Sequence, residues 1–377
     1  MENNNKPRLY YIDNLRIFLI GLVVLHHLAI TYGAPGGWYY QESQAGIPEI
    51  VPMAMFLATN QAFFMGMFFF ISAYFLVPSL ERKGSRQFIN DRLLRLGIPT
   101  LLFFFLLNPL TIFTRNRFLY GDEVGLVDYW LQHPEFGSGP MWFVLALIIF
   151  TATFLAWRAL KTASEKRQPI PLPSPIVIIV AAILIGLGQF IIRIWLPVGW
   201  SMPITNFQLP HFLQYIFLFA LGIVAYQQKW LEQLSPKSGM RWFIAMQALI
   251  FIGFPAIFIG GGAAEGDLSP FMGGMTWQSL AYALWEQLVG FGLIVALFGI
   301  FKMKWNDQGT FGKALSASAY GTYVFHAPIL VGLAVVFLHL PLPQFWKFIA
   351  IAPVALAISF GFAYLLKKLP FIGERIL

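Results

Sequence analysis

The stretch YIDNLRIFLIGLVVLHHLAI, residues 11–30, decides the fold, because it is an apolar run long enough to cross a lipid bilayer as a helix. It follows a short polar head, MENNNKPR, and lacks the small-residue cleavage site that ends a signal peptide. We therefore interpret it as a membrane anchor that stays in the chain. Similar apolar runs recur along the whole sequence.

The apolar runs predict about ten transmembrane helices. A helix needs roughly 20 apolar residues to cross the bilayer core. Runs that meet this length lie at about 11–33, 53–77, 96–114, 140–158, 175–196, 209–227, 242–260, 277–301, 315–339 and 345–366. We predict an all-α integral membrane protein in which these helices form one bundle and residues 1–377 form a single domain.

The composition supports lipid as the solvent. Of the 377 residues, 58% are hydrophobic and only 11% are charged, whereas a soluble domain carries roughly 25% charged residues. The formal charge of +8 does not indicate a nucleic-acid partner, because the basic residues cluster in the short gaps between apolar runs. The absence of cysteine excludes disulfides, thiolate metal sites and a cysteine acyl-enzyme.

The distribution of Lys and Arg predicts the orientation, since cytoplasmic loops carry an excess of basic residues. Alternate gaps are rich in them: Lys6 and Arg8; Arg82, Lys83, Arg86, Arg92 and Arg95; Arg158, Lys161, Lys166 and Arg167; Lys229, Lys237 and Arg241; Lys302, Lys304 and Lys313; Lys367, Lys368 and Arg375. The other gaps carry only Arg115, Arg117, Arg193 and Lys347. The pattern predicts that both termini lie in the cytoplasm.

Ionisable residues inside predicted spans are candidates for function, because each costs about 2.5–3.5 kcal/mol or more at bilayer depth. Arg16 and His27 are eleven residues apart, so on a helix they share a face within roughly 20° and lie about 16 Å apart. This stripe suits a path from an anionic cytoplasmic ligand to an outer acceptor. Alternatively, Arg16 extends to lipid headgroups and His27 bonds a neighbouring helix.

Five further residues, at three sites in the sequence, have two interpretations at each site. Glu286 lies near mid-depth in LWEQL, where it either orients a reacting group or bonds a neighbouring helix. Tyr323 and His326 share a helix face, and serve either chemistry or packing. The paired Arg92 and Arg95 of DRLLRLGIP suit either phosphate binding or anionic lipid.

These motifs together resemble the acyltransferase-3 family, integral membrane enzymes that acylate bacterial surface glycans. Its hallmark is Arg, ten residues, then His, matched by Arg16 and His27. FFFISAYFL (68–76), with Ser72, is similar to the family's second-helix motif, although Ala73 stands where the family usually has Gly. Similar matches are the Arg-x-x-Arg pair at 92 and 95, MWFV (141–144) with Trp142, and YGTYVFHAPI (320–329). The run 211–223 resembles the branch that includes periplasmic glucan succinyltransferases.

The resemblance implies an O-acyltransferase in the bacterial cytoplasmic membrane, with acetyl-CoA or succinyl-CoA as donor and a hydroxyl-bearing carbohydrate or related acceptor outside. It requires no metal. Arg92, Arg95 and Arg16 would hold the coenzyme A phosphates, with Ser72 and Trp142 in the same donor-binding set. His27 would be the general base, and Glu286 would either orient it or help bind the acceptor. Tyr323 and His326 would donate to the developing oxyanion.

A transporter or flippase is the alternative from another class. Many spans, intramembrane ionisable residues and spans interrupted by Pro99, Pro109 and Pro255 are features that transporters share. The ordered family motifs and the lack of a detectable inverted repeat favour the enzyme. A purely structural membrane subunit leaves the Arg16–His27 stripe without a purpose.

Overall fold

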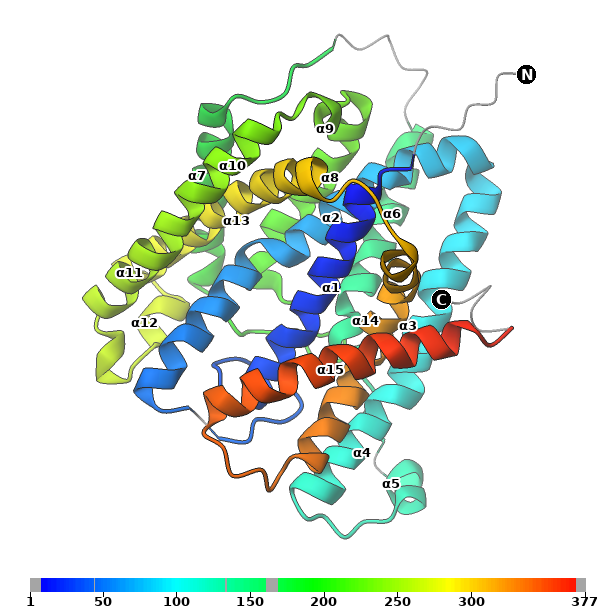
Figure 1. Ribbon diagram of the computed structural model, residues 1–377, viewed down its shortest axis with the longest axis vertical. Helices are drawn as coiled ribbons and strands as arrows, with labels where there is room; N and C mark the ends of the chain where they lie inside the picture. Colours follow the sequence, from blue (N-terminus) through cyan, green and yellow to red (C-terminus); the bar gives the residue numbers. More distant parts are fainter. Residues whose placement is uncertain (1–7, 44, 133, 161–168, 371–377) are drawn as a thin grey trace.

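The computed structural model describes residues 8–43, 45–132, 134–160 and 169–370. Over these residues the chain is helical and contains no strand (Figure 1). Lys6, Lys161, Lys166, Arg167 and Arg375, used above for orientation, lie outside the described residues. The helices are α1 (Tyr10–Thr31), α2 (Ile47–Arg92), η1 (Leu93–Gly97), α3 (Ile98–Leu102), η2 (Phe103–Leu107), α4 (Asn108–Leu119), α5 (Leu126–Gln132), η3 (Gly139–Met141), α6 (Trp142–Leu160), α7 (Pro175–Arg193), η4 (Leu209–His211), α8 (Phe212–Gln227), α9 (Trp230–Gln233), α10 (Pro236–Ala248), η5 (Leu249–Gly253), α11 (Phe254–Gly260), η6 (Ala263–Glu265), α12 (Ser269–Met272), α13 (Trp277–Lys304), α14 (Thr310–Val336) and α15 (Gln344–Lys367).

The all-α membrane fold predicted from the sequence is confirmed. The described residues contain nine helical segments that are long and apolar enough to cross a membrane. One of them, Pro48–Leu119, is 72 residues long, and a straight helix of that length would extend about 108 Å. It is not straight, because Gly84 has a φ of 73° and the chain turns back there. The part of α2 before Gly84 and the helices α3–α4 therefore run in opposite directions (Figure 1). This segment contains both expected spans, 53–77 and 96–114.

The π-helical turns within the long helices follow from the positions of proline residues. The three π-helical turns, η1, η2 and η5, end at Gly97, Leu107 and Gly253, two residues before Pro99, Pro109 and Pro255 respectively. Proline has no N–H, and its ring crowds the carbonyl four residues earlier. A π turn accommodates the misfit without ending the helix.

Helix α13 forms the centre of the bundle, and small residues let its neighbours approach closely. In the most apolar 18-residue stretch of α13, 83% of the residues are buried, whereas the corresponding share for the segment Pro236–Gly260 is 17%. A Cβ on Gly290 of α13 would lie 2.1 Å from the Ala62 carbonyl oxygen of α2. One on Gly222 of α8 would lie 2.3 Å from the Phe70 oxygen and 3.0 Å from the Ala73 Cβ. Gly222 therefore allows α8 to approach α2 closely at Ala73.

The loop after α1 folds back onto its own helix. Gly33, with a φ of 99°, ends α1 in a Schellman motif, because its N–H bonds the Ile30 oxygen and the Ala34 N–H bonds the Ala29 oxygen. Gly36 follows with a φ of 154°, and a Cβ there would lie 2.8 Å from Ile30 Cδ1. Only glycine fits this approach, which returns the following residues to the side of α1.

Candidate active site

His27 on α1 is hydrogen-bonded to His326 on α14. The distance from His27 Nδ1 to His326 Nε2 is 3.1 Å, and the two rings are nearly parallel with centroids 5.1 Å apart. His27 is half-buried, whereas His326 is fully buried. The structure therefore brings together two residues separated by most of the sequence, both singled out above.

The hydrogen-bond network assigns the tautomers of the pair. His326 Nδ1 lies 2.6 Å from the Tyr323 carbonyl oxygen, which can only accept, so this nitrogen carries the hydrogen. His326 Nε2 is then an acceptor, and His27 Nδ1–H is its donor. This chain leaves the lone pair of His27 on Nε2, as the carboxylate–histidine pair of a catalytic triad does for its histidine.

Tyr323 ties the histidine pair to the start of α6. Its hydroxyl donates to the Pro140 carbonyl oxygen. Trp142, two residues later, stacks on Tyr215 with ring centroids 5.7 Å apart. The hydrogens of Tyr323 and His326 are thus both committed to backbone carbonyls, which argues against their proposed role as oxyanion donors.

The basic residues at the other end of α1 form a second part of the site. Arg16 is 38% exposed, lies 3.6 Å from Asp13 and packs over the Phe75 ring at 4.8 Å. Arg92 is close enough to Arg16 for the two positive charges to interact. Its guanidinium packs over the Phe88 ring at 5.2 Å.

Arg95 does not join this pair. It is exposed and interacts electrostatically with Asp91 and Lys367 instead. The equal projection of Arg92 and Arg95 expected from a regular helix is lost, because Arg95 lies inside the π turn η1. Ser72 is half-buried on α2, next to the fully buried Ala73.

A family comparison agrees with the motifs that meet at this site. The model of the acyltransferase-3 family, described as an acyltransferase domain, matches residues 9–367. The chain belongs to the acyltransferase-3 family. It is similar to "Glucans biosynthesis protein C" of Salmonella schwarzengrund and of Salmonella typhimurium, each 27% identical over 245 residues. Each match covers 60% of this chain and 60% of the relative. No solved structure matches it.

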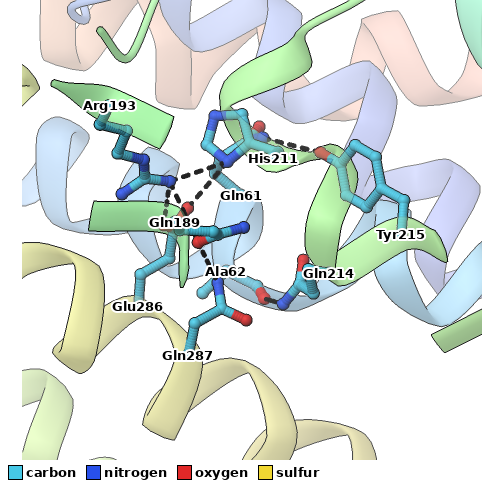
Figure 2. Close-up of polar contacts among 9 residues, drawn as sticks. All are labelled: Gln61, Ala62, Gln189, Arg193, His211, Gln214, Tyr215, Glu286 and Gln287. Carbon is cyan, nitrogen blue, oxygen red and sulfur yellow. Dashed lines mark hydrogen bonds and ion pairs between the residues drawn. The ribbon is translucent and has the colours of Figure 1, made fainter. Parts of the chain in front are cut away.

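Glu286 of this family member lies in a separate buried polar cluster (Figure 2). Its carboxylate forms an ion pair with Arg193 of α7 and lies 3.2 Å from His211 Nδ1. Arg193 also donates to Gln189 Oε1 at 3.3 Å, and Gln287 Nε2 donates to the same oxygen at 2.6 Å. Glu286 is thus engaged by Arg193 and His211, and the His27 ring is oriented by His326 instead.

Sequence reasoning missed the residues that neutralise buried charges. Arg193 and Lys347 were counted as outer-loop charges, yet they are 0% and 1% exposed. Lys347 pairs with Glu42 at 2.8 Å, as Arg193 does with Glu286. The available signal was position: both residues lie inside the helical segments α7 and α15.

Proposed function

We propose that this protein transfers an acyl group from acyl-CoA, bound at its Arg-rich end, to a hydroxyl of an acceptor on the opposite side of the membrane. The observation that carries the proposal is the His27–His326 pair, set on the same helix as Arg16 in a member of an acyltransferase family. The donor is acetyl-CoA or succinyl-CoA.

Arg16 and Arg92 bind the phosphates of coenzyme A. Two guanidiniums close enough to repel each other favour an anion between them, and guanidinium–phosphate hydrogen bonds are among the stronger polar contacts. Asp13 compensates Arg16 only in part, because it also pairs with Arg8 at 2.7 Å. The acyl thioester then extends into the bundle toward His27.

His27 Nε2 is the general base. It takes the proton of the acceptor hydroxyl while the hydroxyl oxygen attacks the thioester carbon. The C–S bond then breaks, and the same proton passes from His27 to the coenzyme A sulfur. His326 holds the His27 ring in the reactive tautomer by accepting from Nδ1–H.

The acceptor class follows from the relatives. Their name assigns them to glucan biosynthesis, and we propose a glucan or a related carbohydrate as the hydroxyl donor here. The cell membrane that faces such glycans is then the bacterial cytoplasmic membrane, with both termini inside.

Binding and turnover of acyl-CoA in detergent test this proposal. The chain has no cysteine, so a thiol reagent reports only released coenzyme A. Wild type should bind acetyl-CoA or succinyl-CoA and release coenzyme A, whereas Arg92→Ala should bind roughly 10- to 100-fold more weakly, since a charged hydrogen bond contributes about 1.5–3 kcal/mol. Arg158→Ala, an exposed arginine on α6, is the matched control. Folded wild type with no affinity for either thioester contradicts the proposal and favours a transporter.

A further inference from the structure

The proposed reaction needs a hydrogen-bond donor for the acyl oxygen, because negative charge develops there when the thioester is attacked. Neither Tyr323 nor His326 has a free hydrogen, as both donate to backbone carbonyls. His27 Nδ1–H is occupied by His326. His27, His326 and Tyr323 therefore supply a base but leave the developing oxyanion without a donor.

Trp38 lies directly against the base. It belongs to the loop that Gly33 and Gly36 fold back onto α1, and its ring stacks on His27 with centroids 3.8 Å apart and planes 14° apart. It is also nearly parallel to His326 at 5.7 Å. Tyr39 packs edge-on against it at 5.0 Å. One face of the Trp38 indole is therefore covered by the His27 ring.

The indole nitrogen is the free polar group of this residue. Trp38 Nε1 is shielded from solvent and has no hydrogen-bond partner among the described residues. A buried N–H without a partner is uncommon and calls for an explanation. His26 Nδ1 is also without a partner among the described residues, but only the indole nitrogen is a donor in every protonation state.

We propose that Trp38 is a catalytic residue whose Nε1–H donates a hydrogen bond to the acyl carbonyl oxygen as His27 deprotonates the acceptor hydroxyl. The ring centroids of His27 and Trp38 are 3.8 Å apart. This short separation suits one ring acting on the attacking oxygen and the other on the acyl oxygen, because both oxygens are bonded to the same tetrahedral carbon. No proton moves to or from the indole. The inference rests on the proposed acyl transfer.

Trp38→Phe keeps an aromatic ring against His27 but removes the N–H. We expect it to lower kcat for coenzyme A release about 10²- to 10³-fold, the usual effect of losing one oxyanion donor, with acyl-CoA affinity unchanged. Trp230→Phe is the matched control, because it removes an indole N–H that donates to the Ile170 oxygen at 2.9 Å, away from the site. It should keep wild-type kcat.

A donor substrate with sulfur in place of the carbonyl oxygen, acetyldithio-CoA, separates hydrogen bonding from packing. Sulfur is a weak acceptor, so Trp38→Phe should slow this substrate far less than it slows acetyl-CoA. Equal slowing of both substrates, or wild-type kcat in Trp38→Phe, would overturn the donor role. Wild-type turnover in His27→Ala would instead contradict the proposed function itself, which makes the two failures distinguishable.

Discussion

His326 is the residue whose role the structure defines most sharply. Because it accepts from His27 Nδ1–H, a side chain with an acceptor at the same reach should preserve the tautomer. We expect His326→Leu to lower kcat by about 10²-fold or more, and His326→Gln to recover a substantial part. Steady-state turnover of acyl-CoA over a pH series checks this. Equal losses in both variants would point to packing alone.

At the residue scale, spacing in the sequence identified part of the site. The eleven-residue interval placed Arg16 and His27 on one helix, and the tertiary structure keeps both beside further functional candidates. Glu286, inside another predicted span, was expected either to orient His27 or to help bind the acceptor. Depth does not specify which helices are neighbours, and α1 contacts α14 through His326 while Glu286 faces α7. Trp38 lies in a loop, where periodicity carries no signal.

At the element scale, Gly222 sets the separation of α2 and α8. A methyl group there would lie 2.3 Å from the backbone oxygen of Phe70, so Gly222→Ala must push the helices apart. We expect a loss of about 1–3 kcal/mol in unfolding free energy, seen as a lower thermal midpoint in detergent. Gly361→Ala on α15, where a Cβ meets nothing within 4 Å, should leave the midpoint unchanged or raise it. Equal midpoints for both variants would contradict the packing account.

The Arg193–Glu286 pair links α7 to α13. Removing one partner strands a buried charge, at a cost of about 3–5 kcal/mol. We therefore expect Arg193→Met and Glu286→Gln each to lower the thermal midpoint strongly, while the double variant should lie closer to wild type than either. A double-mutant cycle measures the coupling. Strictly additive losses would show that the two charges stabilise the bundle independently.

The elements themselves were largely predictable. The length of each apolar run located the spans, because a helix needs a minimum number of apolar residues to cross the bilayer core. The π turns η1, η2 and η5 were not predicted, although their prolines were noticed, because the sequence does not show whether a proline ends, kinks or widens a helix. The projection of Arg95 was misjudged for the same reason.

At the scale of the whole molecule, the fold predicts that Pro48–Leu119 crosses the membrane twice. The native chain has no cysteine, so single-cysteine variants can be labelled without background. Ser85→Cys, beside the turn at Gly84, and Glu123→Cys, after α4, should react with an impermeant maleimide from opposite sides in sealed cells and inverted vesicles. Labelling of both from one side would contradict the double crossing.

Counting loop charges predicts an orientation for the molecule because most basic residues lie in the gaps between predicted spans. It fails for individual charges that packing draws inward. Arg193 and Lys347 were counted with the loops, yet each is buried against an acidic partner on another segment. Such pairs depend on tertiary contacts, which composition does not reveal.

We propose that His27 is the base of an acyl transfer from acyl-CoA. The most direct measurement compares coenzyme A release and acyl-CoA affinity in wild type and His27→Ala, using one folded preparation of each. We expect His27→Ala to bind acyl-CoA like wild type but to lose turnover about 10²- to 10⁴-fold, the usual contribution of a general base. Unchanged turnover in His27→Ala would contradict it.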